Sequence, residues 1–108
     1  MRKQKLLTKE LERCLPPLYD NENKKDPLVC GHFFLGGWDW YPMEYSKDER
    51  VFFGYVAGLE CELGYFSLDE LEGVRNKMGL GVERDTGFKP KPLSKVKEEL
   101  RKNGRCGM

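Results

Sequence analysis

The sequence predicts an α+β domain: a four- or five-stranded antiparallel meander sheet with helices packed mainly on one face. Between residues 28 and 66, short segments rich in apolar and aromatic residues alternate with short turns. At Ser67 this pattern changes to helical spacing, and further helical patterns stand near both ends of the chain. The resulting order, α-ββββ-α-(β)-α, is typical of an antiparallel sheet whose helices gather on one side.

A short first helix is predicted over residues 7–15. Thr8 is a candidate N-cap, because its hydroxyl can accept a hydrogen bond from the amides of the first turn. The residues that recur at helical spacing and form the buried stripe are Leu11, Cys14, Leu15 and Leu18. Pro16 and Pro17 end the helix. The polar segment 19–27 follows without an apolar anchor, so we expect it to be the most mobile loop of the body.

Four strands are predicted, at residues 28–35, 38–45, 51–56 and 59–66. Gly36 and Gly37 form a two-residue hairpin signal, since both positions tolerate a positive φ. Pro42 cannot donate a backbone hydrogen bond, so we expect its strand to lie at an edge or to bulge there. In the fourth strand, one set of alternate residues is predicted to face the core: Leu59, Cys61, Leu63 and Tyr65.

The junction between the fourth strand and the next helix is the best specified in the chain. Ser67 is the predicted N-cap, and Glu70 stands three residues later, as in a capping box. Phe66 and Leu71 are spaced as a hydrophobic staple. The helix is expected to run over residues 68–78 and to end at Gly79.

The C-terminal part is predicted to complete the cover of the sheet. Residues 82–88 are a candidate fifth strand, and the two prolines within residues 89–92 require extended backbone. Ser94 is expected to cap a last helix over residues 95–102. Because its apolar residues are only Val96 and Leu100, this helix is predicted to dock weakly.

At 108 residues the chain is long enough for one domain with a modest core. We expect a single domain over residues 1–108, with an ordered body at 6–102 and flexible ends at 1–5 and 103–108. No apolar run approaches the roughly 20 residues that span a bilayer. The basic start is not followed by the apolar segment of a signal peptide. We therefore expect a cytoplasmic protein without membrane contact.

The four cysteines, Cys14, Cys30, Cys61 and Cys106, show no C-x-x-C spacing. In a cytosolic chain the default state is the free thiol. We expect the first three to pack as small hydrophobic residues and Cys106 to be exposed in the tail.

Charge is segregated along the chain although the net charge is only +1. Residues 1–13 carry five basic and two acidic groups, and residues 89–108 carry seven and two. The middle, residues 14–88, carries seven basic and fourteen acidic groups. A nucleic-acid-binding protein needs one coherent basic face, and this distribution does not indicate one. The simpler interpretation is that the basic ends lie beside the acidic body or are solvated.

Apolar residues on both faces of the predicted sheet indicate that something must cover part of the second face. In the second strand, Trp38 and Trp40 share one face, whereas Tyr41 and Tyr45 share the other. Three covers are consistent with this pattern: the C-terminal segment, a second copy of the chain, or a foreign partner. Tyr and Trp anchor many interfaces, because they combine a large apolar body with a polar group.

A partner-binding surface is therefore predicted around the second strand, where acidic neighbours would favour a basic partner. Its residues are Trp38, Asp39, Trp40, Tyr41, Glu44, Tyr45, Glu60 and Glu62. An alternative nucleic-acid-binding site uses the basic C-terminal arm: Lys89, Lys91, Lys95, Arg101 and Lys102.

Catalytic chemistry has weaker support. Cys30 and His32 would share one face of a strand, and Cys61 could join them, as in a zinc site or a thiol–imidazole pair. A core cysteine beside a locally hydrogen-bonded histidine is the simpler interpretation.

Glu83, Asp85 and Lys89 have the residue types of a metal-dependent nuclease. No pattern supplies the second carboxylate strand that such a site needs, so internal ion pairs are the simpler interpretation. We expect no catalytic residue, no metal and no cofactor.

Several motifs resemble those of a bacterial family known only as a domain of unknown function. They are LPPLY at residues 15–19, ELGYFSLDEL at 62–71, VERD at 82–85 and FKPKPLS at 88–94. The resemblance covers residues 6–96. It implies a small stand-alone protein common on plasmids, conjugative elements and phage-derived DNA, and it supplies no catalytic residues.

The resemblance and the aromatic-acidic surface together predict a non-enzymatic binding protein of a mobile genetic element. Such a protein would inhibit or recruit a host or defence protein complex that is basic or handles nucleic acid. Anti-CRISPR-like anti-defence is its most concrete form. The alternatives are a nucleic-acid accessory module, which would use the basic termini, and a small metal- or Cys/His-dependent enzyme. The chain is expected to be a monomer or a homodimer.

Overall fold

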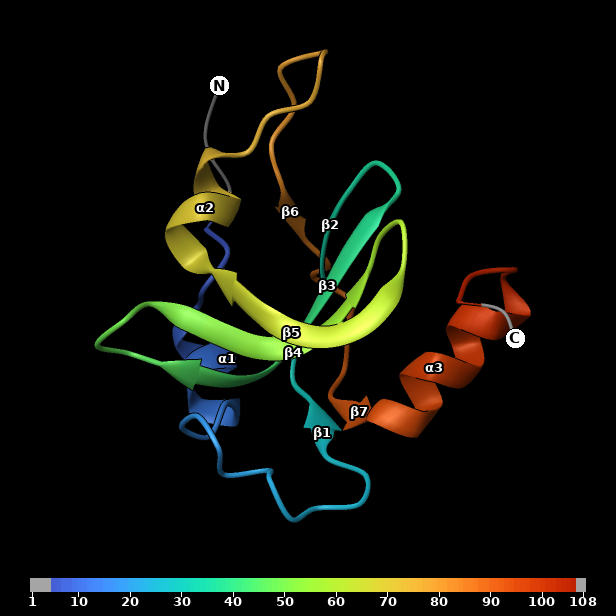
Figure 1. The fold of residues 1–108 in the computed structure, drawn as a ribbon. Coiled ribbons are helices and arrows are strands. Elements are labelled where there is room, and N and C mark those ends of the chain that lie inside the picture. The colour runs from blue at the N-terminus through green and yellow to red at the C-terminus, as the bar shows by residue number, and fades with distance from the viewer. Residues whose placement is uncertain (1–4, 107–108) are drawn as a thin grey trace.

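The computed structural model describes residues 5–106 and confirms the α+β class (Figure 1). A five-stranded antiparallel sheet has the order β5-β4-β3-β2-β6, and β1 and β7 form a separate two-stranded sheet. The elements are α1 (Lys9–Cys14), β1 (Leu28–Val29), β2 (Phe33–Leu35), β3 (Trp38–Ser46), β4 (Val51–Ala57), β5 (Cys61–Ser67), α2 (Leu68–Gly73), β6 (Glu83–Arg84), β7 (Lys91–Pro92) and α3 (Leu93–Lys102). None of the helices in this part of the chain has the length and hydrophobicity needed to cross a membrane.

The central meander has the predicted hairpin and the predicted bulge. Gly36 adopts a φ of 59° in the turn between β2 and β3. The register between β3 and β4 shifts between Pro42 and Glu44, so the strand bulges at the proline. β3 nevertheless lies inside the sheet, between β2 and β4. Opposite Pro42, a Cβ atom on Gly54 would lie 2.0 Å from the Tyr41 carbonyl oxygen, so the close approach requires glycine.

The predicted strand over residues 28–35 is broken into two parts. β1 pairs with β7, whereas β2 pairs with β3 and β6. Between them, Gly31 lies against α1, because a Cβ atom there would be 2.9 Å from a methyl group of Leu11. The packing of the first helix against this point explains why the chain leaves the main sheet before β2.

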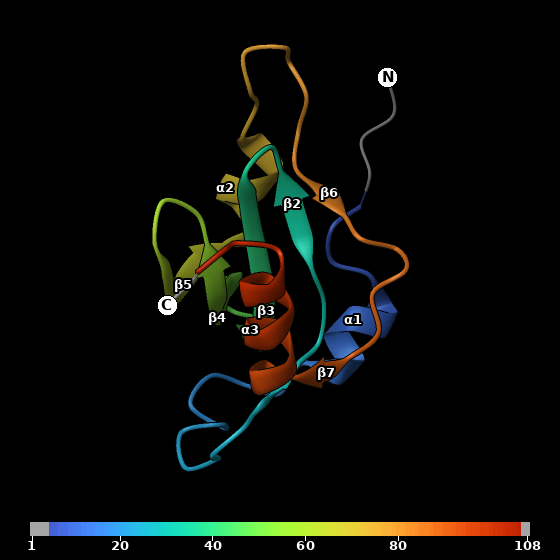
Figure 2. The ribbon, with the colours of Figure 1, turned by 90° about the vertical axis from the view of Figure 1, so that its right-hand side faces the viewer.

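Helices cover both faces of the sheet, and each face has its own core. In Figures 1 and 2, α1 and α2 lie on one side of the sheet and α3 on the other. The first core contains Phe33, Phe52 and Phe66 with Leu11 and Leu71. The second core contains Tyr41, Met43 and Tyr55 with Val96 and Leu100. Of the three predicted covers, the structure shows the C-terminal segment, because α3 covers the second face of the sheet.

The last helix docks firmly, which corrects the expectation of weak docking. It begins at Leu93 and has Pro92 as its N-cap, so a third apolar residue joins the stripe. Leu93, Val96 and Leu100 are all buried. Ser94 is not the cap: its amide and hydroxyl donate to the two carboxylate oxygens of Asp26, at 2.9 and 2.6 Å.

The second helix has the predicted start and a much earlier end. The Ser67 hydroxyl accepts a hydrogen bond from the Glu70 amide at 3.2 Å. The helix stops at Gly73 instead of residue 78. The residues after it form a turn, in which the Asn76 side-chain oxygen accepts from the amides of Met78 and Leu80.

The polar segment 19–27 has an anchor that the sequence pattern did not reveal. The buried carboxylate of Glu44 accepts hydrogen bonds from the amides of Tyr19 and Asn21, both at 2.8 Å. The Asn21 side chain donates to the Met43 carbonyl. A buried polar anchor therefore replaces the missing apolar one.

All four cysteines are paired, which corrects the expectation of free thiols. Disulfides join Cys14 to Cys30 and Cys61 to Cys106. The second disulfide fastens the chain beyond α3 to the start of β5, so residues 103–106 are held on the body instead of forming a loose end. Disulfides form and persist in oxidising surroundings. The cytoplasmic location therefore stays a prediction.

Candidate functional site

The structure separates the residues of the predicted partner-binding surface. Tyr45 is buried in the first core and Tyr41 in the second. Asp39 and Glu44 are also buried and bonded within the chain. Each of these four residues is at most 9% exposed and offers little surface to a partner, so that part of the prediction is not supported.

The two tryptophans lie at the rim of the first core. Trp38 is 43% exposed and stacks on half-buried Trp40, with 6.1 Å between the ring centroids. Trp38 also covers Gly58 in the turn before β5, where a Cβ atom would lie 2.1 Å from its ring. The Trp38 ring is therefore packed against the backbone of that turn.

A different apolar surface lies along β5, at the outer edge of the sheet. Leu59 is 93% exposed, Leu63 47% and Tyr65 56%, although the sequence pattern assigned all three to the core. Glu60 and Glu62 alternate with them in the sequence and are exposed, as predicted, with Glu62 on the opposite face of β5 from Leu63 and Tyr65. We call these five residues, Leu59, Glu60, Glu62, Leu63 and Tyr65, the β5 surface.

The position of α3 determines which side chains of β5 are covered and which are exposed. Leu63 is paired with Tyr55 and Tyr65 with Phe53 in the register of β4 and β5. The helix buries Tyr55, and Lys97 lies over the Tyr55 ring at 5.4 Å. Because α3 reaches no farther across this face, the side chains of Leu63 and Tyr65 remain accessible.

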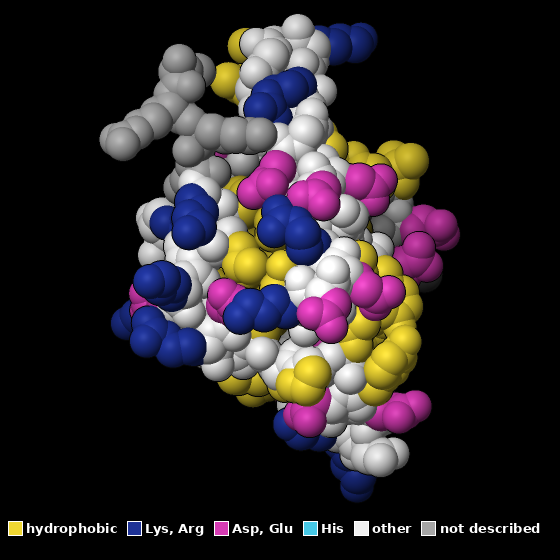
Figure 3. Space-filling view, turned by 90° about the vertical axis from the view of Figure 1, so that its left-hand side faces the viewer, with side chains coloured by type: hydrophobic (Ala, Val, Ile, Leu, Met, Phe, Trp, Pro, Cys, Tyr) yellow, Lys and Arg dark blue, Asp and Glu magenta, His cyan; other side chains and the backbone are white. Residues whose placement is uncertain are grey.

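Acidic groups surround this apolar strip. The neighbouring Tyr19, together with partial burial and smaller contributions from Glu44 and Glu22, raises the pKa of Tyr65 above its ordinary value. Glu60 and Glu62 stand at the other end of the strand. Figure 3 shows hydrophobic and acidic side chains together on the right-hand side of that view, with most Lys and Arg elsewhere. The surface therefore combines exposed apolar area with negative charge.

His32 lies at the centre of a partly buried ionic network on the second face. Its Nε2 is 2.6 Å from Asp39 Oδ1, and its Nδ1 is 3.0 Å from Asp85 Oδ2. The ring stacks on Tyr41, with 4.6 Å between centroids. Arg105 donates to the other Asp39 oxygen at 2.7 Å and to the carbonyls of Gly37 and Ala57. The network ties the C-terminal end of the chain to the sheet.

Charge pairing shifts the pKa values of this network in opposite directions. Burial alone would lower the pKa of His32, but its hydrogen bonds to Asp39 and Asp85 outweigh burial and raise it above 6.5. Burial alone would raise the pKa of Asp39, but the bonds from His32 and Arg105 lower it below 3.8. The charged pair is therefore the favoured state at mildly acidic pH.

We expect the free energy of unfolding to fall as the pH rises from about 6 to about 8. The stabilisation from His32 is complete below its unfolded pKa of 6.5 and is lost as the pH passes through the higher folded value. The stabilisation from Asp39 is present above pH 3.8, its unfolded pKa, and is lost as the pH falls through its lower folded pKa. Urea unfolding at both pH values measures the change. His32→Gln should remove most of it, and an equal change in this variant would show that other groups cause it.

The residues considered for catalysis are occupied by structural interactions. Cys30 and Cys61 are in different disulfides, so neither supplies a thiolate for zinc or for nucleophilic attack. Both ring nitrogens of His32 contact carboxylates, which leaves no lone pair for a substrate proton. Asp85 binds His32, while Glu83 lies exposed on β6. Within residues 5–106, no three His, Cys, Asp or Glu side chains are grouped to hold a metal ion.

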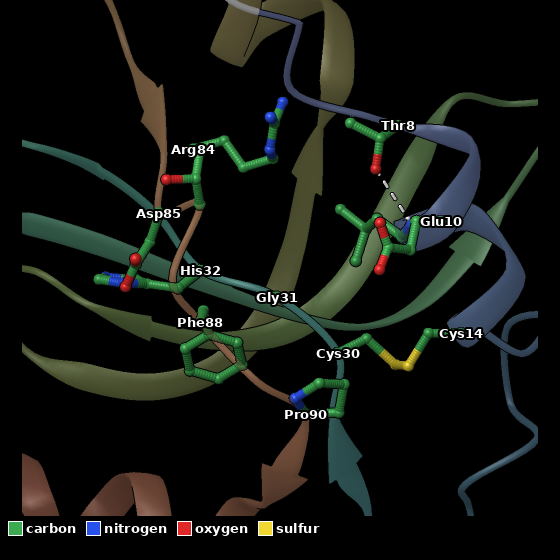
Figure 4. A pocket seen from close by; sticks show the side chains of 12 residues that line it. Thr8, Glu10, Cys14, Cys30, Gly31, His32, Arg84, Asp85, Phe88 and Pro90 are labelled. Carbon is green, nitrogen blue, oxygen red and sulfur yellow. Dashed lines mark hydrogen bonds and ion pairs between the residues drawn. A yellow bond between two sulfur atoms is a disulfide. The ribbon is translucent and has the colours of Figure 1, made fainter.

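A pocket of about 180 Å³ opens beside this network (Figure 4). Its walls include the Cys14–Cys30 disulfide, Glu10, Asp85 and Phe88. In Figure 4 the Asp85 and His32 side chains point toward each other, in keeping with their hydrogen bond. The Thr8 hydroxyl accepts from the Leu11 amide as the cap of α1. The hydrogen bonds of Thr8, His32 and Asp85 at this pocket thus stabilise the fold.

The basic arm of the alternative nucleic-acid site is partly neutralised. Lys91 pairs with Glu99 at 2.9 Å, and both Lys95 and Lys102 pair with Glu98. Lys91 also lies over the Phe88 ring. Arg101 and Lys89 are exposed. The arm therefore presents less positive charge than the sequence suggests, which weakens the case for phosphate binding.

The sequence pattern did not predict that Leu63 and Tyr65 are exposed, and it did not predict the His32 network. The alternation in β5 is the pattern of a half-buried strand, and only the tertiary position of α3 determines what is covered. The network joins residues 32, 39, 85 and 105, which have no common spacing. His32, the single histidine of the sequence, was the only indication of this network.

The comparisons with known proteins add one match. A family described as "Protein of unknown function (DUF2958)" matches residues 3–106. Comparison with the curated proteins and with the solved structures found no significant match.

Proposed function

Because the chain belongs to the DUF2958 family of proteins of unknown function, its function must be argued from its surface, and we propose that it is a small non-enzymatic binding protein. It acts as an inhibitor or adaptor of a host or defence protein complex. Its gene belongs to a mobile genetic element, and its partner is basic or handles nucleic acid.

The β5 surface is the observation that supports this proposal. Leu59, Leu63 and Tyr65 expose large apolar side chains on one edge of the fold, with Trp38 beside the turn before them. Leu63 and Tyr65 are neighbours on one face of β5, and exposed apolar side chains with an aromatic anchor are typical of protein interfaces. Their acidic neighbours, Glu60 and Glu62, disfavour nucleic acid and favour a basic protein.

The absence of an enzymatic role is part of the proposal. Its support is that His32, Cys30 and Cys61 all have structural partners. A general base needs a free lone pair, and a cysteine nucleophile needs a thiolate. The chemistry-bearing residues therefore stabilise the fold, while the exposed edge is left for binding.

Anti-defence, in an anti-CRISPR-like form, is the concrete version of the proposal. Defence complexes hold nucleic acid on basic surfaces, and an acidic protein surface can occupy such a site through complementary charge. The exposed apolar side chains would supply the affinity that charge alone does not. Inhibition would then be steric, with the bound protein excluding nucleic acid.

Leu63→Ser with Tyr65→Ser is expected to abolish anti-defence activity while leaving the fold intact. Both side chains are about half exposed, so the double substitution should change the free energy of unfolding by less than about 1 kcal/mol. The measurement is the plating efficiency of a targeted phage on cells with an active CRISPR–Cas system, with and without the protein. Wild type should restore plating at least tenfold, and the double variant should not.

Met78→Ser is the matched control, because Met78 is 81% exposed but lies on the loop after α2. It should restore plating like the wild type. Equal activity of the wild type and the double variant would remove the β5 surface from the function. A wild type without effect on CRISPR–Cas or on restriction would contradict the anti-defence proposal itself.

A further inference from the structure

We propose that the partner binds by adding an extended, basic segment to the outer edge of β5 as a sixth strand of the sheet. This inference rests on the proposed function, because it specifies how the same surface is used. Strand addition draws affinity from backbone hydrogen bonds and specificity from alternate side chains. Both requirements can be checked against the structure of β5.

The first requirement is a free edge. β5 is the terminal strand in the order β5-β4-β3-β2-β6, and within residues 5–106 its ladder partner is β4. Every second residue of an edge strand directs its N–H and C=O groups away from the sheet. These outward groups of Cys61–Ser67 are the template for an added strand.

The second requirement is the lack of protection. Natural edges are blunted by charged side chains, especially Lys, and by Pro, bulges or short strands. β5 has the sequence CELGYFS, in which Glu62 is the one charge and Lys and Pro are missing, and its seven residues pair with β4 in unbroken register. The opposite edge strand, β6, has only two residues. The sheet is therefore protected on one side and open on the other.

The third requirement is a readable pattern of side chains. Leu63 and Tyr65 project on one face of β5, whereas Glu62 and Gly64 lie on the other. A Cβ atom on Gly64 would meet nothing within 4 Å, so this face has room for a neighbouring long side chain. An added strand would place apolar residues beside Leu63 and Tyr65 and basic residues beside Glu62.

The accessible register is short. At the far end, Phe66 is buried and Ser67 caps α2, so pairing there would meet the helix. Residues 61–65 remain, which corresponds to about 17 Å of extended chain. A segment of about seven residues is therefore long enough to use the whole edge.

Charge selects a basic segment over a second copy of this chain. Antiparallel pairing of two copies about Leu63, the middle of residues 61–65, would place Glu62 of each copy opposite Gly64 of the other, so the two Glu62 side chains would be diagonal neighbours on one face of the sheet. Both carboxylates are on exposed residues. Like charges at this distance repel, whereas lysines of a foreign strand would be attracted.

The test uses a synthetic peptide of seven residues in which Lys and Val alternate. Two further peptides carry N-methyl groups on alternate backbone amides, on one edge or on the other. An N-methyl group removes the donor and blocks pairing at that edge while it keeps every side chain. Binding is measured by fluorescence titration, and hydrogen exchange of the β5 amides reports the location.

We expect the unmodified peptide to bind and to slow exchange within residues 61–65. One N-methylated peptide should bind at least tenfold more weakly, and the other should bind like the parent. Glu60→Gln with Glu62→Gln should weaken binding severalfold and reduce its salt dependence. Equal binding of all three peptides would overturn strand addition.

The outcomes separate this inference from the proposed function. If the peptide does not bind but anti-defence activity still requires Leu63 and Tyr65, the surface is used in another way and strand addition is wrong. If the peptide binds at β5 but no anti-defence activity is found, strand addition stands and the proposed function is wrong. A dimer in sedimentation that Leu63→Ser disrupts would make a second copy the occupant and contradict a basic segment.

Discussion

Replacing Cys61 and Cys106 together by serine is expected to lower the free energy of unfolding by about 4 kcal/mol. The disulfide closes a loop with a sequence separation of 45 residues, so its loss gives the unfolded chain much more conformational freedom. It also fastens the chain beyond α3, and that helix covers Tyr41 and Tyr55 in the second core. Urea unfolding of the oxidised proteins measures the difference.

The Cys14–Cys30 disulfide provides the comparison. It closes a shorter loop, with a sequence separation of 16 residues, so replacing both cysteines by serine should cost about 3 kcal/mol. We therefore expect the first double variant to be the less stable of the two. Titration of four reactive thiols in protein that was folded under oxidising conditions would contradict both disulfides. Equal stability of all the variants and the wild type would contradict their structural role.

Asp39→Ala is expected to lower the free energy of unfolding by about 3 kcal/mol near pH 6. Asp39 accepts from both His32 and Arg105, so its removal takes the carboxylate from Arg105 and leaves His32 with Asp85 alone. Breaking one partner of such a network costs more than the network contributes as a whole. Chemical unfolding gives the free energy.

Asp85→Ala is the matched control for this prediction. Its side chain is 37% exposed and it contacts His32 but not Arg105, so its loss should cost less than half as much. Arg105→Ala should lie between the two, because it removes bonds to Asp39, Gly37 and Ala57 on a partly exposed side chain. An Asp39→Ala variant as stable as the wild type would show that the network adds little to the fold.

The meander was predictable because each of its signals is local. Gly36 marks the hairpin by its backbone freedom, and Pro42 marks the bulge because it cannot donate to a ladder. Ser67 marks the start of α2 through a hydroxyl that only needs an amide three residues away. Such signals act within a few residues, so tertiary packing did not override them.

The errors occur where distant residues decide the outcome. Glu44 is a surface residue by its type, yet it is buried because the amides of Tyr19 and Asn21 satisfy its carboxylate. The cysteines pair across separations of 16 and 45 residues, which no spacing rule encodes. α2 ends at Gly73, and Asn76 holds the turn that stands in place of its predicted last residues.

The candidate site was predicted in character but not in place. Sequence reasoning expected an aromatic and acidic surface, and it identified Glu60 and Glu62 correctly as exposed. It centred that surface on β3, whose tyrosines are buried in the two cores. The accessible apolar residues lie two strands away, on β5, because α3 covers β3 and β4 but not the edge.

Hydrogen exchange of the protein bound to the defence complex that we propose as its partner tests the central claim most directly. The claim is that the β5 surface contacts the partner, so binding should slow exchange in residues 59–67. The loop at residues 74–81, which exposes Met78 and Leu80 elsewhere on the molecule, should be unchanged. Protection confined to α3, to β6 or to that loop, with residues 59–67 exchanging as in the free protein, would contradict the account.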